Sequence, residues 1–324
     1  MTRPSIGVLV MAHGTPAARE EIAAFYTRIR RGRPPSAEQL AELWRRYEAI
    51  GGTSPLAQRT AAQVAGVARE LERAAPGSFT VRFGAKHTVP FIEDAASALA
   101  RETDSIVGIV LTPHRASMGS DEYLLRAAEA IAAAGGGTEL VAVRQWWDAP
   151  GFAELVAGRV HEALARVRAD GPPTVLFSAH SLPQRVIAAG DPYPDQVAAS
   201  GDAVAAAADL ARAGIPWRVA WQSAGRTPEP WIGPDIRATL HELAQEGTRA
   251  VVVCPIGFVA DHLEVLYDVD IEARRMADAL GLALVRTESL NDDPRLLTIL
   301  AAVVRRAAGG EAAGGSSAAG TGEQ

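Results

Sequence analysis

Three carboxylates recur at every fourth residue in a stretch late in the chain. Glu264, Asp268 and Glu272 follow the apolar run 250–254, which predicts a buried strand. On a helix this spacing stacks the three side chains on one face, where like charges repel unless they meet solvent or a cation. Carboxylate oxygens suit Mg²⁺ or Fe²⁺. Because α/β proteins bind ligands beyond the carboxyl ends of strands, the position favours a cation site over a solvated acidic face.

Histidines follow predicted strands in both halves of the chain. His13 comes after the apolar run 6–12, and His180 comes just after the run 174–178, in the same half as the acidic row. An isolated histidine is more often structural, but an imidazole beside carboxylates binds a borderline metal or exchanges protons near neutral pH. We therefore predict that His180 works with the acidic row and that His13 approaches from the other half. The remaining histidines are expected to be structural or to lie on the surface: His87, His114, His161, His241 and His262.

A donor-rich segment, residues 28–55, lies between the first two predicted strands. It carries several arginines together with Tyr47 and Ser54, and Ser36 with Gln39 has the capping-box pattern that begins a helix. Guanidinium groups bind carboxylates or phosphates, and the interleaved aromatic side chains favour a flat apolar ligand with anionic edges over a solvated basic face. Because no Gly-x-Gly-x-x-Gly motif or P-loop follows any predicted strand, nucleotide binding has no support.

Composition excludes several classes of protein. The 324 residues carry a formal net charge of −6, which gives no basic field for nucleic acid. The single cysteine, Cys254, excludes an internal disulfide and any cysteine-based zinc or iron–sulfur site made by this chain alone. No segment has the length and hydrophobicity of a membrane span, and the first residues do not resemble a signal peptide. We expect a cytoplasmic protein without membrane insertion.

Short apolar runs alternate with helical patterns, which predicts an α/β protein with parallel sheets and helices on both faces of each sheet. The second half repeats the first in three segments. Residues 8–16 align with 175–183, 90–94 with 230–235, and 110–114 with 252–256. Two similar halves would place two ligand-binding sheet edges on either side of one cleft.

The motifs together resemble one family, the ferrochelatases, and most closely the soluble Gram-positive type that acts on coproporphyrin III. The similarity spans nearly everything except the last residues, and only the combination is specific. The segments that carry it are Val10-Met11-Ala12-His13-Gly14-Thr15-Pro16, Ile29-Arg30-Arg31-Gly32-Arg33, Arg46-Tyr47-Glu48-Ala49-Ile50-Gly51-Gly52, Ser54-Pro55-Leu56-Ala57-Gln58, Ser178-Ala179-His180-Ser181-Leu182-Pro183, Gly190-Asp191-Pro192-Tyr193-Pro194-Asp195-Gln196, Trp221-Gln222-Ser223, Trp231-Ile232-Gly233-Pro234-Asp235 and 257–268.

The resemblance implies two Rossmann-like domains with a porphyrin cleft between them. We expect a first domain over residues 1–145, with the porphyrin-binding insert at about 28–55, and a second domain over 146–306. The last helix, predicted over 294–306, is expected to pack back on the first domain. Residues 307–324 have no apolar pattern and are predicted to be a disordered tail.

By position, His180 and Glu264 match the family's metal-insertion pair, and Asp268 and Glu272 match an acidic ridge that handles metal or protons. His13 departs from the resemblance, since related Gram-positive enzymes commonly have tyrosine there, on the side of the porphyrin opposite His180. Imidazole also ligates iron, so the departure concerns axial ligation of the product. Five further residues match positions that contact the porphyrin and its propionates: Arg30, Arg46, Tyr47, Ser54 and Tyr123.

The implied activity is insertion of Fe²⁺ into coproporphyrin III in haem biosynthesis, with Fe²⁺ as substrate, no tightly held organic cofactor and no iron–sulfur cluster. A divalent cation such as Mg²⁺ is expected at the acidic ridge, and the next enzyme of the haem pathway is an expected transient partner. Alternatives are a protoporphyrin IX ferrochelatase, another tetrapyrrole chelatase, and a porphyrin- or haem-carrying protein. The acidic row argues against a carrier, which has no need of it.

Overall fold

The computed structural model describes residues 6–135, 137–167, 173–225 and 227–309. Its first half contains a parallel sheet in the order β2-β1-β3-β4. The strands are β1 (Ile6–Ala12), β2 (Phe79–Ala85), β3 (Ser105–Val110) and β4 (Glu139–Val143). Side chains alternate across β1, so Leu9 and Met11 pack under α4 (Ile92–Glu102) and α5 (Ser120–Ala134), while Val8 and Val10 face α3 (Leu56–Ala74).

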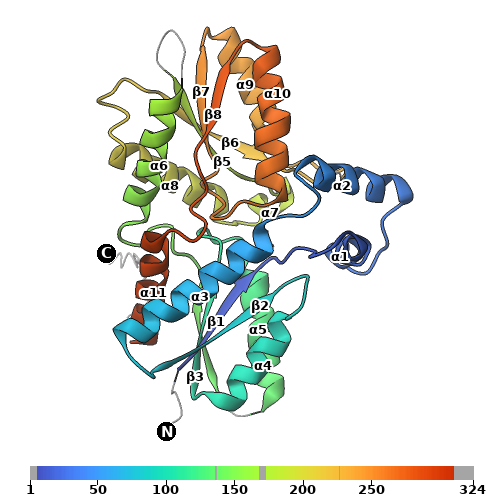
Figure 1. The fold of residues 1–324 in the computed structure, drawn as a ribbon, viewed down its shortest axis with the longest axis vertical. Coiled ribbons are helices and arrows are strands. Elements are labelled where there is room, and N and C mark those ends of the chain that lie inside the picture. The colour runs from blue at the N-terminus through green and yellow to red at the C-terminus, as the bar shows by residue number, and fades with distance from the viewer. Residues whose placement is uncertain (1–5, 136, 168–172, 226, 310–324) are drawn as a thin grey trace, which may run out of the picture.

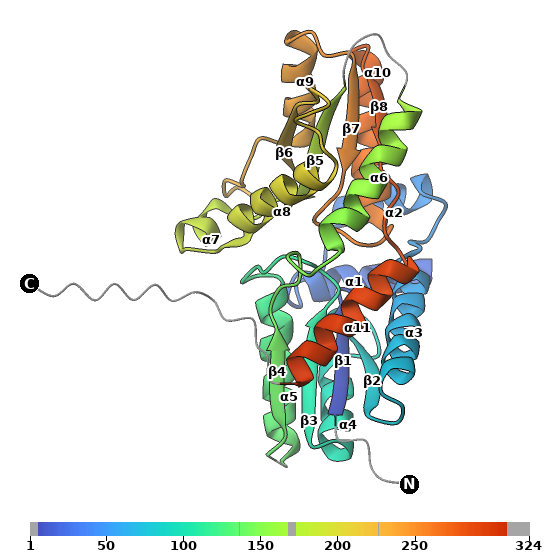
Figure 2. The ribbon, with the colours of Figure 1, turned by 90° about the vertical axis from the view of Figure 1, so that its left-hand side faces the viewer.

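The second half contains a parallel sheet in the order β6-β5-β7-β8. Its strands are β5 (Thr174–His180), β6 (Trp217–Gln222), β7 (Ala250–Cys254) and β8 (Ala283–Arg286). One face packs against α6 (Phe152–Arg166) and α8 (Tyr193–Ala207), and the other against α9 (Ile236–Gln245) and α10 (Arg274–Ala279). The prediction of parallel sheets with helices on both faces is therefore confirmed. The two sheets lie end to end, and the carboxyl ends of their strands point toward the middle of the molecule (Figures 1 and 2).

The equal strand order confirms the duplication, but two of the three sequence matches were shifted. Ala85 N donates to Pro90 O and Trp221 N donates to Pro234 O, so the counterpart of Pro90 is Pro234 and not Pro230. The register pairs Val10 with Ile109 and Phe177 with Cys254. Cys254 therefore corresponds to Ile109, whereas the sequence alignment paired it with Thr112, three residues later. The alignment was shifted because apolar strands match one another in several registers.

The insert between β1 and β2 begins with a short 3₁₀ turn, η1 (Arg19–Glu21), followed by α1 (Ile22–Ile29) and α2 (Ala37–Ala49). The predicted capping box is confirmed, since Gln39 N donates to Ser36 Oγ at 3.2 Å and Ser36 N donates to Gln39 Oε1 at 3.0 Å. Both helices project to one side of the molecule, level with the junction between the sheets (Figure 1).

A short helix, α7 (Gln184–Ala188), precedes α8 and was not expected from the sequence. The last helix, α11 (Pro294–Ala308), includes two residues of the predicted tail, and residues 310–324 of that tail lie outside the described residues. Although α11 follows the second sheet in the chain, it packs against α3, β3 and β4 of the first (Figure 2). Within the described residues, no helix is long and apolar enough to cross a membrane.

Candidate active site

The acidic row lies on a π-helix, η2 (Val265–Ala273), and not on the α-helix that we predicted. Glu264 is the residue just before this helix, and α10 continues from its end. A π-helix has a wider turn than an α-helix, so residues four apart fall just short of one turn, and the carboxylates keep to one side. π-Helical segments are rare and are frequently found at functional sites. The acidic row is consistent with that tendency.

A glycine allows the loop before the row to approach β5 closely. Gly257 N donates to Ser178 O at 3.1 Å, and a Cβ at Gly257 would lie 2.9 Å from Ala179 Cα. No side chain fits at that distance, so a larger residue would push the loop away from the strand that ends in His180. The sequence Pro255-Ile256-Gly257 thus brings the ends of β5 and β7 together.

His180 and Glu264 face each other, with His180 Nε2 3.6 Å from Glu264 Oε1. His180 Nδ1 lies 2.5 Å from Ser181 O, and because a carbonyl only accepts, Nδ1 carries a proton. Burial opposes charge on the imidazole, but the Glu264 carboxylate outweighs it and raises the pKa of His180 to about 9. Burial likewise opposes charge on Glu264, but His180 and His262 hold the pKa of its carboxyl well below the usual range. At neutral pH the pair is an imidazolium and a carboxylate.

The second Glu264 oxygen faces His262, which we had expected at a surface or helix position. His262 Nε2 lies 3.6 Å from Glu264 Oε2, and its ring packs against Phe258 with centroids 4.7 Å apart. His262 Nδ1 donates to Ala260 O at 2.9 Å, which directs Nε2 toward the carboxylate. The expectation was therefore wrong. The sequence places His262 two residues before Glu264, but only the folded loop shows that its ring turns toward the carboxylate.

Asp268 joins the two halves of the molecule. Ser223 Oγ donates to Asp268 Oδ2 at 2.5 Å, and Arg46 Nη1 from α2 lies 3.5 Å from Asp268 Oδ1. Burial and the nearby Glu264 carboxylate raise the pKa of Asp268 to about 6, although Ser223 and Arg46 oppose that rise. The Arg46 guanidinium also lies over the Tyr267 ring, 4.9 Å from its centroid. In this structure a predicted porphyrin-binding arginine thus pairs with the acidic row.

Across the described residues, no three histidine, cysteine, aspartate or glutamate side chains are close enough together to form a cation site. His180 and Glu264 form a pair, while Asp268 lies one turn further along with its own partners. Glu272 lies half-buried a further turn away. The predicted metal set of His180, Glu264, Asp268 and Glu272 therefore stays a prediction.

His13 approaches from the first half, directly after β1. Its ring packs against Phe25 and His87, with centroids 5.8 and 4.7 Å apart. Loss of hydration lowers the pKa of His13, although part of the ring stays exposed, while Glu264 acts in the opposite direction from across the junction. Burial and the neighbouring His13 lower the pKa of His87 to about 3. Both imidazoles are neutral at physiological pH.

The remaining predicted porphyrin contacts lie in different settings, and of these only Tyr47 and Tyr123 are close enough to Glu264 for its carboxylate to act on their pKa values. Tyr47 is buried and its hydroxyl lies 3.4 Å from Thr15 Oγ1. Ser54 is buried and its Oγ accepts from Leu56 N, which begins α3. Tyr123 is buried beneath Lys86, whose Nζ lies 4.9 Å from the ring centroid. Arg30 lies over the Tyr26 ring and donates to Arg33 O.

The segment 190–196 connects the halves, a role that the sequence did not reveal. Asp191 Oδ2 accepts from Ser117 N at 2.7 Å, and Gln196 Oε1 accepts from Arg115 N at 2.8 Å. Both donors belong to the loop after β3, so that loop is bonded to the start of α8 and to the residues just before it. A separate hollow of about 730 Å³ lies between α1 and α2, lined by Arg28, Arg31 and Leu40 among others, and contains neither His180 nor Glu264.

Comparison with known proteins agrees with this arrangement. A family model described as ferrochelatase matches residues 5–308. The chain belongs to the ferrochelatase family. It is 41% identical over 309 residues to the coproporphyrin III ferrochelatase of Halalkalibacterium halodurans, covering 94% of this chain and 98% of that protein. It is 42% identical over 300 residues to the ferrochelatase of Herpetosiphon aurantiacus, covering 92% and 97%.

The solved structures support the same fold. SirB from Bacillus subtilis with Fe³⁺ matches with a TM-score of 0.58 and 13% identity, covering 95% of this chain and 97% of SirB. At that identity the likeness concerns the fold alone. Ferrochelatase membership and the chelatase-like fold thus come from independent comparisons, one of sequence and one of structure.

Proposed function

We propose that this ferrochelatase inserts Fe²⁺ into coproporphyrin III to give the iron porphyrin of haem biosynthesis. The observation that carries the proposal is the pair His180–Glu264 at the junction of the two sheets, where the Glu264 carboxylate also acts on the pKa of His13 in the other half. The substrate is supported by the relatives named coproporphyrin III ferrochelatase and by the arginine-rich insert, which suits a ring with several carboxylates. Protoporphyrin IX, which has fewer carboxylates, remains the second candidate.

The reaction releases two pyrrole N–H protons for each Fe²⁺ that enters the ring. At neutral pH His180 carries a proton on Nε2, because Glu264 stabilises the imidazolium. Fe²⁺ arriving at the Glu264 carboxylate would weaken that stabilisation, so His180 would release its proton to solvent. The freed Nε2 lone pair would then take one pyrrole proton as the metal moves into the ring, and it would pass that proton to the acidic row or to solvent before it takes the second. His262 keeps the second Glu264 oxygen in place.

The acidic row gives the protons and cations a route. Asp268, with its pKa raised to about 6, changes charge near physiological pH and lies one turn beyond Glu264. We propose that Asp268 and Glu272 relay protons outward or cations inward, and that a bound Mg²⁺ is one occupant of this ridge. Arg46 would exchange Asp268 for a porphyrin propionate when the substrate binds, since a charge-assisted pair is available with either partner.

The porphyrin itself would lie between the sheets, with His13 on the face opposite His180. Arg30, Arg46, Tyr47, Ser54 and Tyr123 are proposed to contact the ring or its propionates. A bent ring exposes a nitrogen lone pair, so tight contact from both halves would promote metal entry. A cytoplasmic location and transient contact with the next haem-pathway enzyme belong to the same proposal.

The test is anaerobic metal insertion followed by absorption spectroscopy, with Fe²⁺ and either coproporphyrin III or protoporphyrin IX. Fast conversion of coproporphyrin III and slow conversion of protoporphyrin IX is the expected result. A preference for protoporphyrin IX would keep the enzyme class and overturn the substrate. Tight binding of either ring without insertion would instead indicate a porphyrin carrier.

A further inference from the structure

The segment between β8 and α11 makes a dense set of bonds to the loop that precedes Glu264. Asn291 lies in this segment with a φ of 48°, a conformation that asparagine tolerates better than most residues. Asp261 N donates to Asn291 Oδ1 at 2.9 Å, and Asn291 Nδ2 donates to Asp261 Oδ2 at 3.0 Å. Because a backbone N–H must meet the oxygen of the amide, the orientation of this side chain is fixed. Asn291 N also donates to Val259 O at 2.7 Å.

The same aspartate is held from its other side. Ser289 Oγ donates to Asp261 Oδ1 at 2.7 Å, and Arg286 Nη1 lies 3.3 Å from that oxygen. Arg286 also makes a two-pronged contact with Asp270 of the π-helix, at 2.8 and 2.9 Å. Asp261 immediately precedes His262, and Asp270 lies six residues after Glu264. The loop that carries His262 and the π-helix that carries the acidic row are thus each bonded to this segment, through the neighbouring Asp261 and Asp270.

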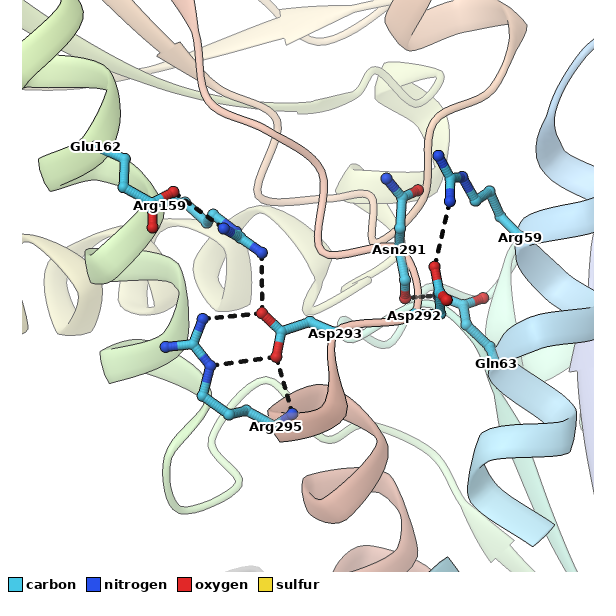
Figure 3. Close-up of polar contacts among 8 residues, drawn as sticks. All are labelled: Arg59, Gln63, Arg159, Glu162, Asn291, Asp292, Asp293 and Arg295. Carbon is cyan, nitrogen blue, oxygen red and sulfur yellow. Dashed lines mark hydrogen bonds and ion pairs between the residues drawn. The ribbon is translucent and has the colours of Figure 1, made fainter. Parts of the chain in front are cut away.

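The segment also reaches the first half of the molecule. Gln63 Nε2, on α3, donates to Asn291 O at 2.7 Å. The neighbouring Asp292 pairs with Arg59 of α3 at 3.3 Å (Figure 3). Asp293 instead pairs with Arg159 of α6, in the second half, at 2.9 Å. Helix α3 begins two residues after Ser54, directly behind the insert. Asn291 is therefore bonded to the loop before Glu264 by its side chain and its backbone N–H. Its backbone carbonyl is bonded to α3 of the first half.

We infer that Asn291 is a positioning residue, which holds the His262–Glu264 loop at a fixed place relative to the porphyrin-binding half through Asp261 and Gln63. This inference rests on the proposed function, because the distance being fixed is that between the metal site and the ring. Insertion requires the metal at Glu264 to meet pyrrole nitrogens held by the other half. Loosening the loop would slow insertion without weakening porphyrin binding, since Asn291 touches none of the residues proposed to bind the ring.

The test exchanges the two ends of the Asn291–Asp261 contact. Asn291→Asp alone puts two carboxylates side by side and removes the amide donor. Combining Asn291→Asp with Asp261→Asn restores one amide and one carboxylate in the reverse order, and the backbone N–H of residue 261 keeps an acceptor. Asp292→Asn is the matched control, since it alters the adjacent, largely exposed pair with Arg59.

We expect Asn291→Asp to lower kcat for Fe²⁺ insertion about 10- to 100-fold, as outer-shell partners of metal sites commonly do, with KM for the porphyrin unchanged. The double variant should recover most of the lost kcat, and Asp292→Asn should resemble the wild type. Asn291→Gly keeps the backbone unstrained at this positive φ and should show the same loss of kcat. It replaces Asn291→Asp in the comparison with wild type if Asn291→Asp folds poorly. A variant series with wild-type kcat throughout, or a loss that the double exchange does not restore, would overturn the inference.

A second readout does not depend on turnover. The imidazole NMR signals of His180 and His262 should shift in Asn291→Asp and return in the double variant, because both rings depend on the position of Glu264. If the wild type inserts no iron, the proposed function fails, while these signals still report whether Asn291 positions the loop. Unchanged signals in Asn291→Asp would contradict the positioning role whatever the enzyme's substrate.

Discussion

The two halves share one sheet order, yet equivalent strand ends have opposite electrostatics. After β1, His13 packs against His87 and Phe25, and the loss of hydration keeps it neutral. At the end of β5, His180 meets Glu264, which raises its pKa to about 9. The imidazole is the same in both places, and the difference comes from what the neighbouring loop supplies.

That neighbouring loop follows β3 in the first half and β7 in the second. The loop after β3 carries His114, which is buried between Trp147 and Tyr193, and both of its ring nitrogens lack a hydrogen-bond partner among the described residues. The loop after β7 carries His262 and Glu264. In the duplicated frame, one loop thus packs between the halves, and the other carries the carboxylate that pairs with two histidines.

The largest expected effect comes from removing the charged imidazole. His180→Ala should lower the rate of Fe²⁺ insertion at least about 10²-fold, the usual contribution of a positioned proton-transfer group. Porphyrin binding, followed by fluorescence quenching, should persist, because most of the residues proposed to bind the ring lie in the first half. His241→Ala, on the exposed face of α9, serves as the control. Near-normal turnover of His180→Ala would refute the contrast between the two histidines.

Arg46 tests whether the insert and the acidic row compete for one guanidinium. Arg46→Ala should raise KM for coproporphyrin III about tenfold, since a charged hydrogen bond contributes about 1.5 kcal/mol or more. Arg45→Ala is the matched control, because that neighbour is exposed and its ion pair among the described residues is with Glu42, away from Asp268. Equal KM values in both variants would remove Arg46 from the binding site.

His114 gives a stability effect with a defined pH dependence. Burial lowers its pKa from 6.5 to about 3, so below pH 6.5 the unfolded chain takes up a proton that the folded chain does not. The stabilising contribution is complete above pH 6.5 and is lost as the pH falls toward 3. Relative to His114→Gln, the wild type should therefore lose about 2 kcal/mol of unfolding free energy between pH 7 and pH 5. If denaturant unfolding gave wild type and His114→Gln the same dependence of unfolding free energy on pH, a neutral buried His114 would be contradicted.

His13 should have the smallest effect on rate. His13→Phe keeps an aromatic ring against His87 but cannot ligate iron, so insertion should continue while the absorption spectrum of the bound product changes. An identical product spectrum in wild type and variant would show that His13 does not reach the iron. A large loss of rate would instead move part of the chemistry to the first half.

Local patterns were enough to predict most of the fold. The apolar run 250–254 was predicted to be a buried strand, and the structure confirms it. Ser36 with Gln39 predicted the start of a helix, which the structure also confirms. The type of the helix after Glu264 was not predictable, because carboxylates four residues apart fit an α-helix and a π-helix equally well. The correspondence between strands of the two halves was also not predictable, because valine-rich strands match one another at several offsets.

Contacts between the halves could not be predicted from the sequence, because they join residues that are far apart in the chain. Asp191 bonds Ser117, Arg46 pairs with Asp268, and Asn291 joins Gln63 to Asp261. None of these pairs has a periodicity or spacing that marks it. His262 was misjudged for a related reason, since only the folded loop turns its ring toward Glu264.

Glu264→Gln tests the central claim most directly, because it removes the charge and keeps the shape of the side chain. Without the carboxylate, burial is left to lower the pKa of His180, and the proposed anionic ligand of the metal is lost. The account predicts that the variant binds coproporphyrin III as the wild type does and leaves the bound ring metal-free under anaerobic Fe²⁺. Insertion by Glu264→Gln at a rate near that of the wild type would contradict it.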